Sequence, residues 1–277
     1  MNTILIGELG VNHNSDMNII KHLIDVCSDL NIPYVKFQKR TIEDVYTQEQ
    51  LDSYRESPWG TTFRQQKEAL ELSLEQYKEI SNYCKEKEIS FFVSPWDVRS
   101  IDFLKINFPD MHYLKIPSAK VTDEIYLQKC IESGFDLILS TGMCDLAMVQ
   151  KAVLAIKDNL RFLLCCTSSY PCPTEDINLN QIKFLSYYFK TNECDIGYSD
   201  HSGGILFPSV AVALGAKMIE VHITDDRRMY GSDQASSIEP QGLRKLVKYI
   251  EELEIGMGNP CKEIMPSEIP IIKKLRG

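Results

Sequence analysis

The chain has 277 residues, of which 44% are hydrophobic and 25% charged, and its formal net charge is −9. The acidic balance excludes a general binder of nucleic acids or membrane surfaces, which needs clustered Lys and Arg, so any anionic ligand must be held by a few placed cations. No apolar run approaches the roughly 18 residues of a membrane-spanning helix, and residues 1–10 lack a secretory-signal pattern. These features predict a cytoplasmic location.

Short apolar runs alternate with amphipathic stretches along the whole chain, which is the pattern of parallel strands joined by helices. Helical periodicity is clear in residues 16–30 and 73–88. Eight such units predict one (β/α)8 TIM-barrel domain over residues 1–277, and no GxGxxG motif supports a doubly wound dinucleotide-binding fold. The expected strands are 3–9, 34–38, 90–94, 113–117, 137–141, 162–166, 195–199 and 218–222.

The connection over residues 39–72 is longer than an ordinary loop between a strand and a helix. It contains Tyr54, Arg55 and Trp59, which suit either a substrate-covering loop or a segment packed on the barrel rim.

Nine cysteines are scattered along the chain without a CxxC pair. This spacing favours small apolar filler in a reducing compartment over disulfides or a zinc site. Cys165 and Cys166 stand apart because they lie at a strand end among candidate site residues.

Polar side chains stand at the carboxyl end of every expected strand, where a barrel of this kind keeps its active site. Lys36 and Lys115 lie inside otherwise apolar runs, and a buried ammonium requires an anion or hydrogen bonds. With the nearby hydroxyls they predict a site for phosphate and carboxylate groups. The strand-end residues are Glu8, Lys36, Gln38, Ser94, Lys115, Ser118, Ser140, Thr141, Thr167, Ser168, Ser199, Asp200, His201, Glu220 and His222.

His201 and His222 follow successive strands, so their rings can converge without sharing a helix. Neutral imidazoles near the carboxylates of Glu8, Asp200 and Asp233 suit a divalent cation such as Mn²⁺, Mg²⁺, Co²⁺ or Zn²⁺. The alternative is a pair of hydrogen-bonded structural histidines.

Nine sequence motifs, in order over nearly the whole chain, resemble the sialic acid synthase (N-acetylneuraminate synthase) family. The resemblance implies a metal-dependent transferase that condenses phosphoenolpyruvate with a sugar aldehyde and water, giving a 3-deoxy-2-keto sugar acid and phosphate. The motifs are GELGVNHN, VKFQ, FFVSPWD, LKIPSA, ILSTGM, CCTSSYP, IGYSDHSGG, ALGAKMIEVHITDDR and GSDQASSIEP.

The resemblance also implies roles for individual residues. His201 and His222 would hold the metal, with Mn²⁺ preferred and Mg²⁺ or Co²⁺ as alternatives, and Glu8, Lys36 and Lys115 would complete the catalytic set. Phosphoenolpyruvate would contact Lys36, Ser94, Lys115, Ser118, Ser140, Ser168 and Ser199, and Thr167 joins the substrate-binding residues. The sugar acceptor would face Gln38, Tyr170 and Asp233. A homodimer is implied as well.

Several features depart from the family pattern and concern the acceptor more than the reaction. The family adds an antifreeze-like domain after the barrel, and none is expected here because the sequence ends at PSEIPIIKKLRG. Lys120, Cys165, Val221 and Gln234 stand where the family often has other residues. The acceptor can therefore be N-acetylmannosamine-like or another aldose, as in an octulosonate-type synthase. The other hypotheses are a metal-dependent pyruvate aldolase and a ligand-binding scaffold without turnover.

Overall fold

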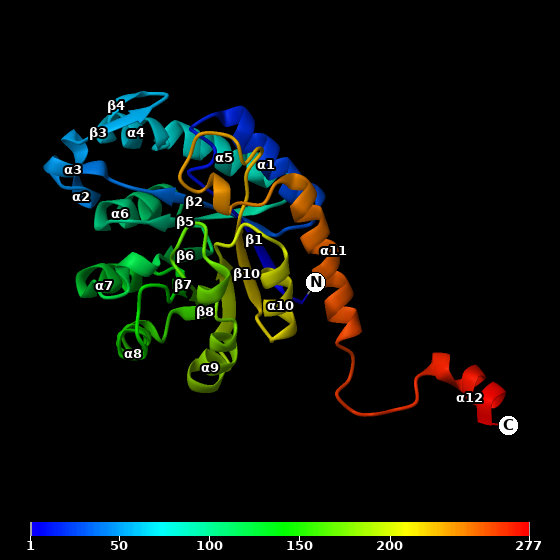
Figure 1. Ribbon diagram of the computed structural model, residues 1–277. Helices are drawn as coiled ribbons and strands as arrows, with labels where there is room; N and C mark the ends of the chain where they lie inside the picture. Colours follow the sequence, from blue (N-terminus) through cyan, green and yellow to red (C-terminus); the bar gives the residue numbers. More distant parts are fainter. Residues whose placement is uncertain (1, 277) are drawn as a thin grey trace.

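A computed structural model describes residues 2–276 of the chain. Eight parallel strands close into a barrel in the order β1-β10-β9-β8-β7-β6-β5-β2, with helices around the outside (Figure 1). The predicted (β/α)8 barrel is confirmed, and each predicted strand lies within two residues of the observed one. The strands are β1 (Ile4–Gly10), β2 (Tyr34–Lys39), β5 (Ser90–Pro95), β6 (Tyr113–Ile116), β7 (Asp136–Ser140), β8 (Leu160–Cys166), β9 (Asp195–Asp200) and β10 (Met218–His222).

The helices follow from their caps and apolar spacing. The Asp16 carboxylate accepts a hydrogen bond from the Asn18 amide at 2.8 Å, which caps α1, and α5 begins with a capping box of Ser73 and Gln76. The helices are α1 (Met17–Asp29), α2 (Ile42–Val45), α3 (Gln48–Asp52), α4 (Phe63–Leu70), α5 (Leu74–Glu86), α6 (Val98–Asn107), α7 (Glu124–Ser133), α8 (Leu146–Ile156), α9 (Asn180–Phe189), α10 (Leu206–Ala213), α11 (Pro240–Gly256) and α12 (Ile269–Arg276).

Two fully buried tyrosines attach outer helices to the carboxyl ends of the strands. The Tyr77 hydroxyl on α5 donates to the Gln38 carbonyl at 2.8 Å, and the Tyr126 hydroxyl on α7 donates to the Pro95 carbonyl at 2.6 Å. A buried hydroxyl needs such a partner, and each ring adds a large apolar contact. The ends of β2 and β5 are therefore held firmly where polar side chains enter the barrel.

The long connection over residues 39–72 is structured. It forms α2, α3, the hairpin of β3 (Tyr54–Ser57) and β4 (Gly60–Thr62), and α4. The Trp59 ring lies 5.7 Å from the Tyr230 ring, and the Gln66 amide donates to the Tyr230 hydroxyl at 2.7 Å. Tyr54 points into solvent with 75% of its surface exposed. The segment therefore packs onto the rim loops, which is one of the two interpretations that the sequence left open.

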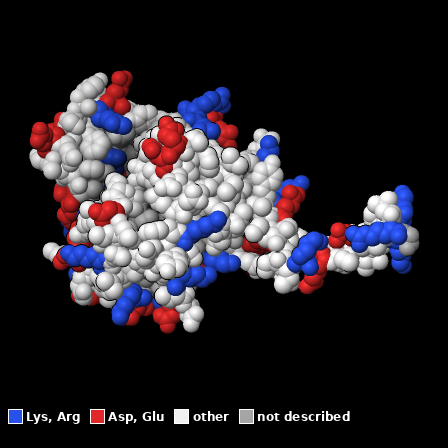
Figure 2. Space-filling view, turned by 60° about the horizontal axis from the view of Figure 1, so that its bottom comes forward, with Lys and Arg blue, Asp and Glu red and all other residues white. Residues whose placement is uncertain are grey.

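The last part of the chain leaves the barrel. After α11 an extended segment leads to α12, which lies away from the barrel (Figure 1). On the face seen in Figure 2, basic and acidic side chains are interspersed over the barrel. Within residues 2–276, no helix combines the length and the apolar character needed to cross a membrane.

Candidate active site

A cavity of about 250 Å³ opens at the carboxyl ends of the strands. All the predicted catalytic and substrate-binding residues line it except Thr167 and Asp233. A larger cavity of about 420 Å³ lies near the amino end of β5, away from these residues. The lining of the strand-end cavity is Glu8, Lys36, Gln38, Ser94, Trp96, Lys115, Pro117, Ser118, Ala119, Ser140, Met143, Cys166, Ser168, Tyr170, Ser199, His201, Glu220 and His222.

Two lysines and two glutamates form a buried network at the bottom of this cavity. Lys36 Nζ lies 3.0 Å from Glu8 Oε2 and 3.5 Å from Glu220 Oε1, and Lys115 Nζ lies 2.7 Å from Glu220 Oε2. All four side chains are at most 5% exposed. The sequence placed both lysines correctly but gave Glu220 no role, although Glu220 is the carboxylate that contacts both of them.

The two glutamates of this network have pKa values shifted in opposite directions. Burial alone would raise the pKa of Glu220, but Lys115 and Lys36 together lower it well below its usual value. Burial raises the pKa of Glu8 more than the nearby Lys36 lowers it. Burial lowers the pKa of Lys115, and the charge of Lys36 adds to that effect. Glu220 is therefore a firm anion, whereas Glu8 is poised to exchange a proton.

Hydroxyl and amide groups complete the wall of the cavity. Lys36 donates to Ser94 Oγ at 3.2 Å, Ser199 Oγ donates to Glu220 at 3.2 Å, and the Gly142 amide donates to Ser118 Oγ at 3.1 Å. A Cβ at Gly142 would lie 2.2 Å from the Ser168 hydroxyl and 2.9 Å from the Ser118 hydroxyl, so a larger residue there would displace these two cavity side chains. The buried Ser140 hydroxyl has no hydrogen-bond partner within residues 2–276 and faces the cavity.

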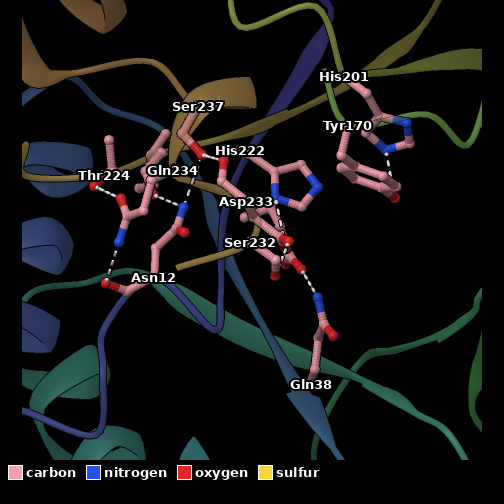
Figure 3. A network of polar contacts seen from close by, with 12 residues as sticks. Asn12, Gln38, Tyr170, His201, His222, Thr224, Ser232, Asp233, Gln234 and Ser237 are labelled. Atoms are coloured by element: carbon pink, nitrogen blue, oxygen red, sulfur yellow. Dashed lines mark hydrogen bonds and ion pairs between the residues drawn. The ribbon is translucent and has the colours of Figure 1, made fainter. Parts of the chain in front are cut away.

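The two predicted histidines meet at the side of the cavity. The ring centroids of His201 and His222 lie 5.3 Å apart. His201 Nδ1 lies 2.6 Å from the Thr167 carbonyl oxygen, and His201 Nε2 lies 3.1 Å from the Tyr170 hydroxyl (Figure 3). In the neutral ring the carbonyl contact keeps the proton on Nδ1, which leaves the Nε2 lone pair toward the cavity.

His222 is held by a carboxylate rather than by a hydrogen bond. Its Nδ1 lies 3.6 Å from Asp233 Oδ2, and its other ring nitrogen faces the side of Tyr170 and His201 (Figure 3). Burial lowers the pKa of His222 to about 4. The nearby Asp233 opposes this shift, whereas the positive charges of His201 and Lys36 add to it. The ring is therefore neutral at pH 7, which is the form that binds metals.

These groups fit a divalent cation that takes only part of its ligands from the protein. His201 Nε2 contacts only the Tyr170 hydroxyl, and His222 Nδ1 is a buried atom without a hydrogen-bond partner in the described structure. Over residues 2–276 no three His, Cys, Asp or Glu side chains gather as a complete ligand set. Water and substrate oxygens would therefore occupy the remaining positions, as in open catalytic sites.

Of the two cysteines that the sequence analysis set apart, Cys166 lines the cavity and Cys165 does not. The Cys166 Sγ lies 3.8 Å from His201 Nδ1 and 3.8 Å from the hydroxyls of Ser118 and Ser168. Burial opposes ionisation, but His201 and then Lys115 lower the pKa of this thiol to about 7. Cys84, by contrast, has its pKa raised to about 12 by burial and behaves as filler. The sequence shows the place of Cys166 at a strand end, but not its contact with His201.

Three strand-end residues do not line the cavity, and their side chains bond to neighbouring groups instead. The Thr167 hydroxyl donates to the Asp176 carbonyl at 2.8 Å, and the Thr141 hydroxyl donates to the Leu164 carbonyl at 3.0 Å. The Asp200 carboxylate accepts from the Tyr198 hydroxyl at 2.9 Å and the Ser202 hydroxyl at 2.8 Å. Asp200 therefore braces the turn after β9 rather than joining the histidines.

A buried amide network ties the loop after β1 to the loop that carries Asp233 (Figure 3). Gln234 accepts from the Thr224 hydroxyl and donates to the Asn12 carbonyl at 3.3 Å. Asn12 donates to Ser237 Oγ at 2.7 Å, and Ser237 donates to the Asp233 carbonyl at 2.6 Å. The position of Asp233 beside His222 therefore depends on the neutral side-chain amides of Asn12 and Gln234.

Comparison with known proteins supports the same interpretation. A model described as NeuB family matches residues 23–262. N,N'-diacetyllegionaminic acid synthase of Campylobacter jejuni is 36% identical over 98% of this chain and 83% of its own length. Human N-acetylneuraminate-9-phosphate synthase is 35% identical over 98% of this chain and 76% of its own length. The crystal structure of N-acetylneuraminic acid synthetase from Leptospira borgpetersenii, in complex with citrate, is 32% identical with a TM-score of 0.84, covering 99% of this chain and 92% of that one.

A closed parallel barrel with buried lysines and paired histidines at its carboxyl end defines a (β/α)8-barrel enzyme. With the matches to relatives named as synthases, the prediction that the chain is an enzyme is confirmed. The chain belongs to the NeuB family, as its motifs indicated.

Proposed function

We propose that the chain condenses phosphoenolpyruvate with a sugar aldehyde and water, giving a nonulosonic acid and phosphate. The observation that carries this proposal is the pair of buried ammonium groups, Lys36 and Lys115, in one cavity with two histidines. The names of the relatives support it, since they are synthases of legionaminic, sialic and pseudaminic acids. The particular acid made here is part of the proposal.

Phosphoenolpyruvate would bind at the bottom of the cavity through its phosphate and carboxylate. Lys36 and Lys115 supply the positive charge, and the partnerless Ser140 hydroxyl supplies a donor. The lysines already share Glu220, so an incoming anion would contact ammonium groups whose positions are fixed in advance. Such preorganised charge stabilises the phosphate as its negative charge grows during departure.

The reaction joins the enol carbon of phosphoenolpyruvate to the aldehyde carbon, and the aldehyde oxygen takes a proton. Water then adds at the carbon that bears the phosphate ester, and phosphate leaves by cleavage of the carbon–oxygen bond. Glu8 is the group that would take the proton from this water. Gln38 holds Glu8 Oε1 at 2.7 Å, and burial raises the pKa of Glu8, which makes the carboxylate a better proton acceptor.

A divalent cation would be held by His201 and His222, with Mn²⁺ preferred and Mg²⁺ or Co²⁺ as alternatives. When bound, it polarises the acceptor carbonyl. Tyr170 contacts His201 through its hydroxyl, and Asp233 contacts His222, so both lie where the acceptor would approach the histidines. Gln38, bonded to Glu8, completes the acceptor side of the cavity.

Phosphate release from phosphoenolpyruvate, measured with Mn²⁺ and a panel of aldoses, tests the proposal. We expect release with at least one acceptor, and loss of phosphoenolpyruvate affinity in Lys115→Ala but not in the matched control Lys245→Ala on the exposed face of α11. No release with any acceptor would refute the synthase. Turnover of pyruvate that survives Lys115→Ala would favour the pyruvate aldolase instead.

The homodimer and the cytoplasmic location expected from the sequence remain predictions. Light scattering after size-exclusion chromatography measures the first, and a mass of one chain would contradict it.

A further inference from the structure

Arg40 lies one residue beyond β2, and its charge is directed at an amide rather than at a carboxylate. Its Nη2 donates to Gln38 Oε1, and Gln38 Nε2 donates to Glu8 Oε1 at 2.7 Å. In the described part of the chain the guanidinium forms no ion pair, although the neighbouring Lys39 is paired with Glu71 at 2.7 Å. One amide therefore joins a cation outside the cavity lining to a carboxylate at the bottom of the cavity.

The two charges decide which way round the Gln38 amide lies. A carboxylate only accepts hydrogen bonds and a guanidinium only donates them, so the amide nitrogen faces Glu8 and the amide oxygen faces Arg40. Turning the amide end for end would place oxygen against oxygen at Glu8 and N–H against N–H at Arg40. Because hydrogen bonds to charged groups are stronger than neutral ones, the observed orientation is favoured at both ends.

The space around the contact between Glu8 and Gln38 is small. Gly10 lies beside it with φ of 54°, and a Cβ there would lie 3.0 Å from Glu8 Oε1 and 3.1 Å from Gln38 Nε2. The two side chains have little room to shift, whereas rotation of the amide exchanges two groups of nearly equal size. That rotation is the freedom that Arg40 removes.

Arg40 is itself held in place by its surroundings. Its Cζ lies 4.5 Å from the centroid of the Trp96 ring, which is a cation–π distance. Two backbone donors support this arrangement: the Trp96 N–H donates to the Lys39 carbonyl at 2.9 Å, and the Arg40 N–H donates to Glu71 Oε1 at 3.0 Å. The guanidinium is thus fixed before any substrate binds.

The second oxygen of Glu8 is the one that stays open. Glu8 Oε2 lies 3.0 Å from Lys36 Nζ but accepts no hydrogen bond from the residues that the structure describes. Such a carboxylate oxygen can accept a proton from water in the cavity. Its position depends on whatever holds Oε1, because both oxygens belong to one planar group.

We propose that Arg40 is a positioning residue for proton transfer to Glu8: acting through Gln38, it fixes the carboxylate so that Oε2 meets the attacking water. The inference rests on the proposed function and adds a residue that does not line the cavity. As the water oxygen bonds to the carbon that bears the phosphate ester, its O–H bond breaks and the proton passes to Oε2. A misplacement of about 1 Å can cost roughly a hundredfold in rate, so a residue remote from the substrate can control kcat.

The test measures kcat and the KM for phosphoenolpyruvate in the phosphate-release assay, with Mn²⁺ and an acceptor that the wild type uses. Arg40→Met keeps an unbranched side chain on Trp96 and removes the charge. We expect kcat to fall about tenfold or more, the range of a hydrogen bond to a charged group, with KM unchanged within about twofold. Arg40→Lys keeps a charged donor and should recover part of the loss. The matched control Arg244→Met, at an exposed position of α11, should keep the wild-type kcat.

A double-mutant cycle separates positioning from direct substrate binding and from a general effect on folding. It is measured in single turnovers with enzyme in excess, so that slow variants still give a rate. In a Gln38→Leu background no amide remains to be oriented, and Arg40→Met should then change the rate by less than about twofold. If Arg40 contacted the substrate or acted only on stability, the two losses would multiply.

Three outcomes would overturn the inference: a wild-type kcat in Arg40→Met, a rise confined to the KM for phosphoenolpyruvate, or losses that multiply in the double variant. In each of these cases, phosphate release by the wild type keeps the proposed function intact. No release by the wild type with any acceptor would remove both.

Discussion

Glu220→Gln tests the buried charge network most sharply because the change keeps the shape of the side chain and removes its charge. In the wild type, Glu220 accepts from Lys115 at 2.7 Å and from Ser199 at 3.2 Å. The amide leaves the ammonium of Lys115 buried without an anion. Breaking a buried pair from one side costs about 3–5 kcal/mol, and we expect the lower end because one carbonyl acceptor remains.

The expected loss can be read as a melting temperature. An unfolding entropy of about 2.1 cal/mol/K per residue converts 3 kcal/mol to a fall of about 5 °C for a chain of this length. Denaturant titration gives the free energy of unfolding directly, with the exposed Glu251→Gln as control, expected within about 0.5 kcal/mol of wild type. Inorganic phosphate should restore part of the loss, because it supplies an anion to the unpaired lysine.

The pH dependence follows from the lowered pKa of Glu220. A carboxylate whose pKa is lower in the folded state than in the unfolded state stabilises the protein at pH values above its ordinary pKa of 4.5. This stabilisation declines as the pH falls below 4.5. The difference between wild type and Glu220→Gln should therefore be full at pH 7 and shrink below about pH 4.5. A variant as stable as wild type at pH 7, or one that phosphate does not stabilise, would refute the reasoning.

Three further predictions concern the histidine side of the cavity. His222→Ala should abolish tight Mn²⁺ binding measured by calorimetry, and unchanged binding would exclude His222 as a ligand. In metal-free protein, the rate of Cys166 alkylation, followed by mass spectrometry, should rise with pH around a midpoint near 7. His201→Ala should move that midpoint upward, and equal midpoints would contradict the contact between Cys166 and His201. Gln234→Glu places a carboxylate against the Asn12 carbonyl, so kcat should fall at pH 8 by about tenfold and recover toward lower pH, where the protonated acid donates again. Gln234→Ala, which cannot donate at any pH, should show no such recovery.

Most of the fold was predictable because its signals are local and repeated. Strands such as β10 are short apolar runs that end in a polar residue, and their alternation with amphipathic helices sets the barrel. The segment over residues 39–72 was harder to predict. Helices of four and five residues, such as α2 and α3, are too short to show a period, and the hairpin β3–β4 is stabilised by a contact with Tyr230, far along the chain.

The site was predictable where residue type and position agree. An ammonium inside an apolar run, as at Lys115, requires a partner, but the sequence does not show that the partner is Glu220, 105 residues away. The strand-end position marked both Cys165 and Cys166, but the sequence does not show that only Cys166 contacts His201. Asp200 had the right residue type beside His201, yet its carboxylate turns to Tyr198 because side chains alternate along the strand end.

The central claim is that one cavity holds an anion on two lysines beside a metal on two histidines. A crystal structure of the protein with Mn²⁺ and phosphoenolpyruvate tests it most directly. The account predicts Mn²⁺ bound by the imidazoles of His201 and His222, with the substrate phosphate or carboxylate in contact with Lys36 and Lys115. Phosphoenolpyruvate bound elsewhere, or Mn²⁺ bound away from both rings, would contradict it.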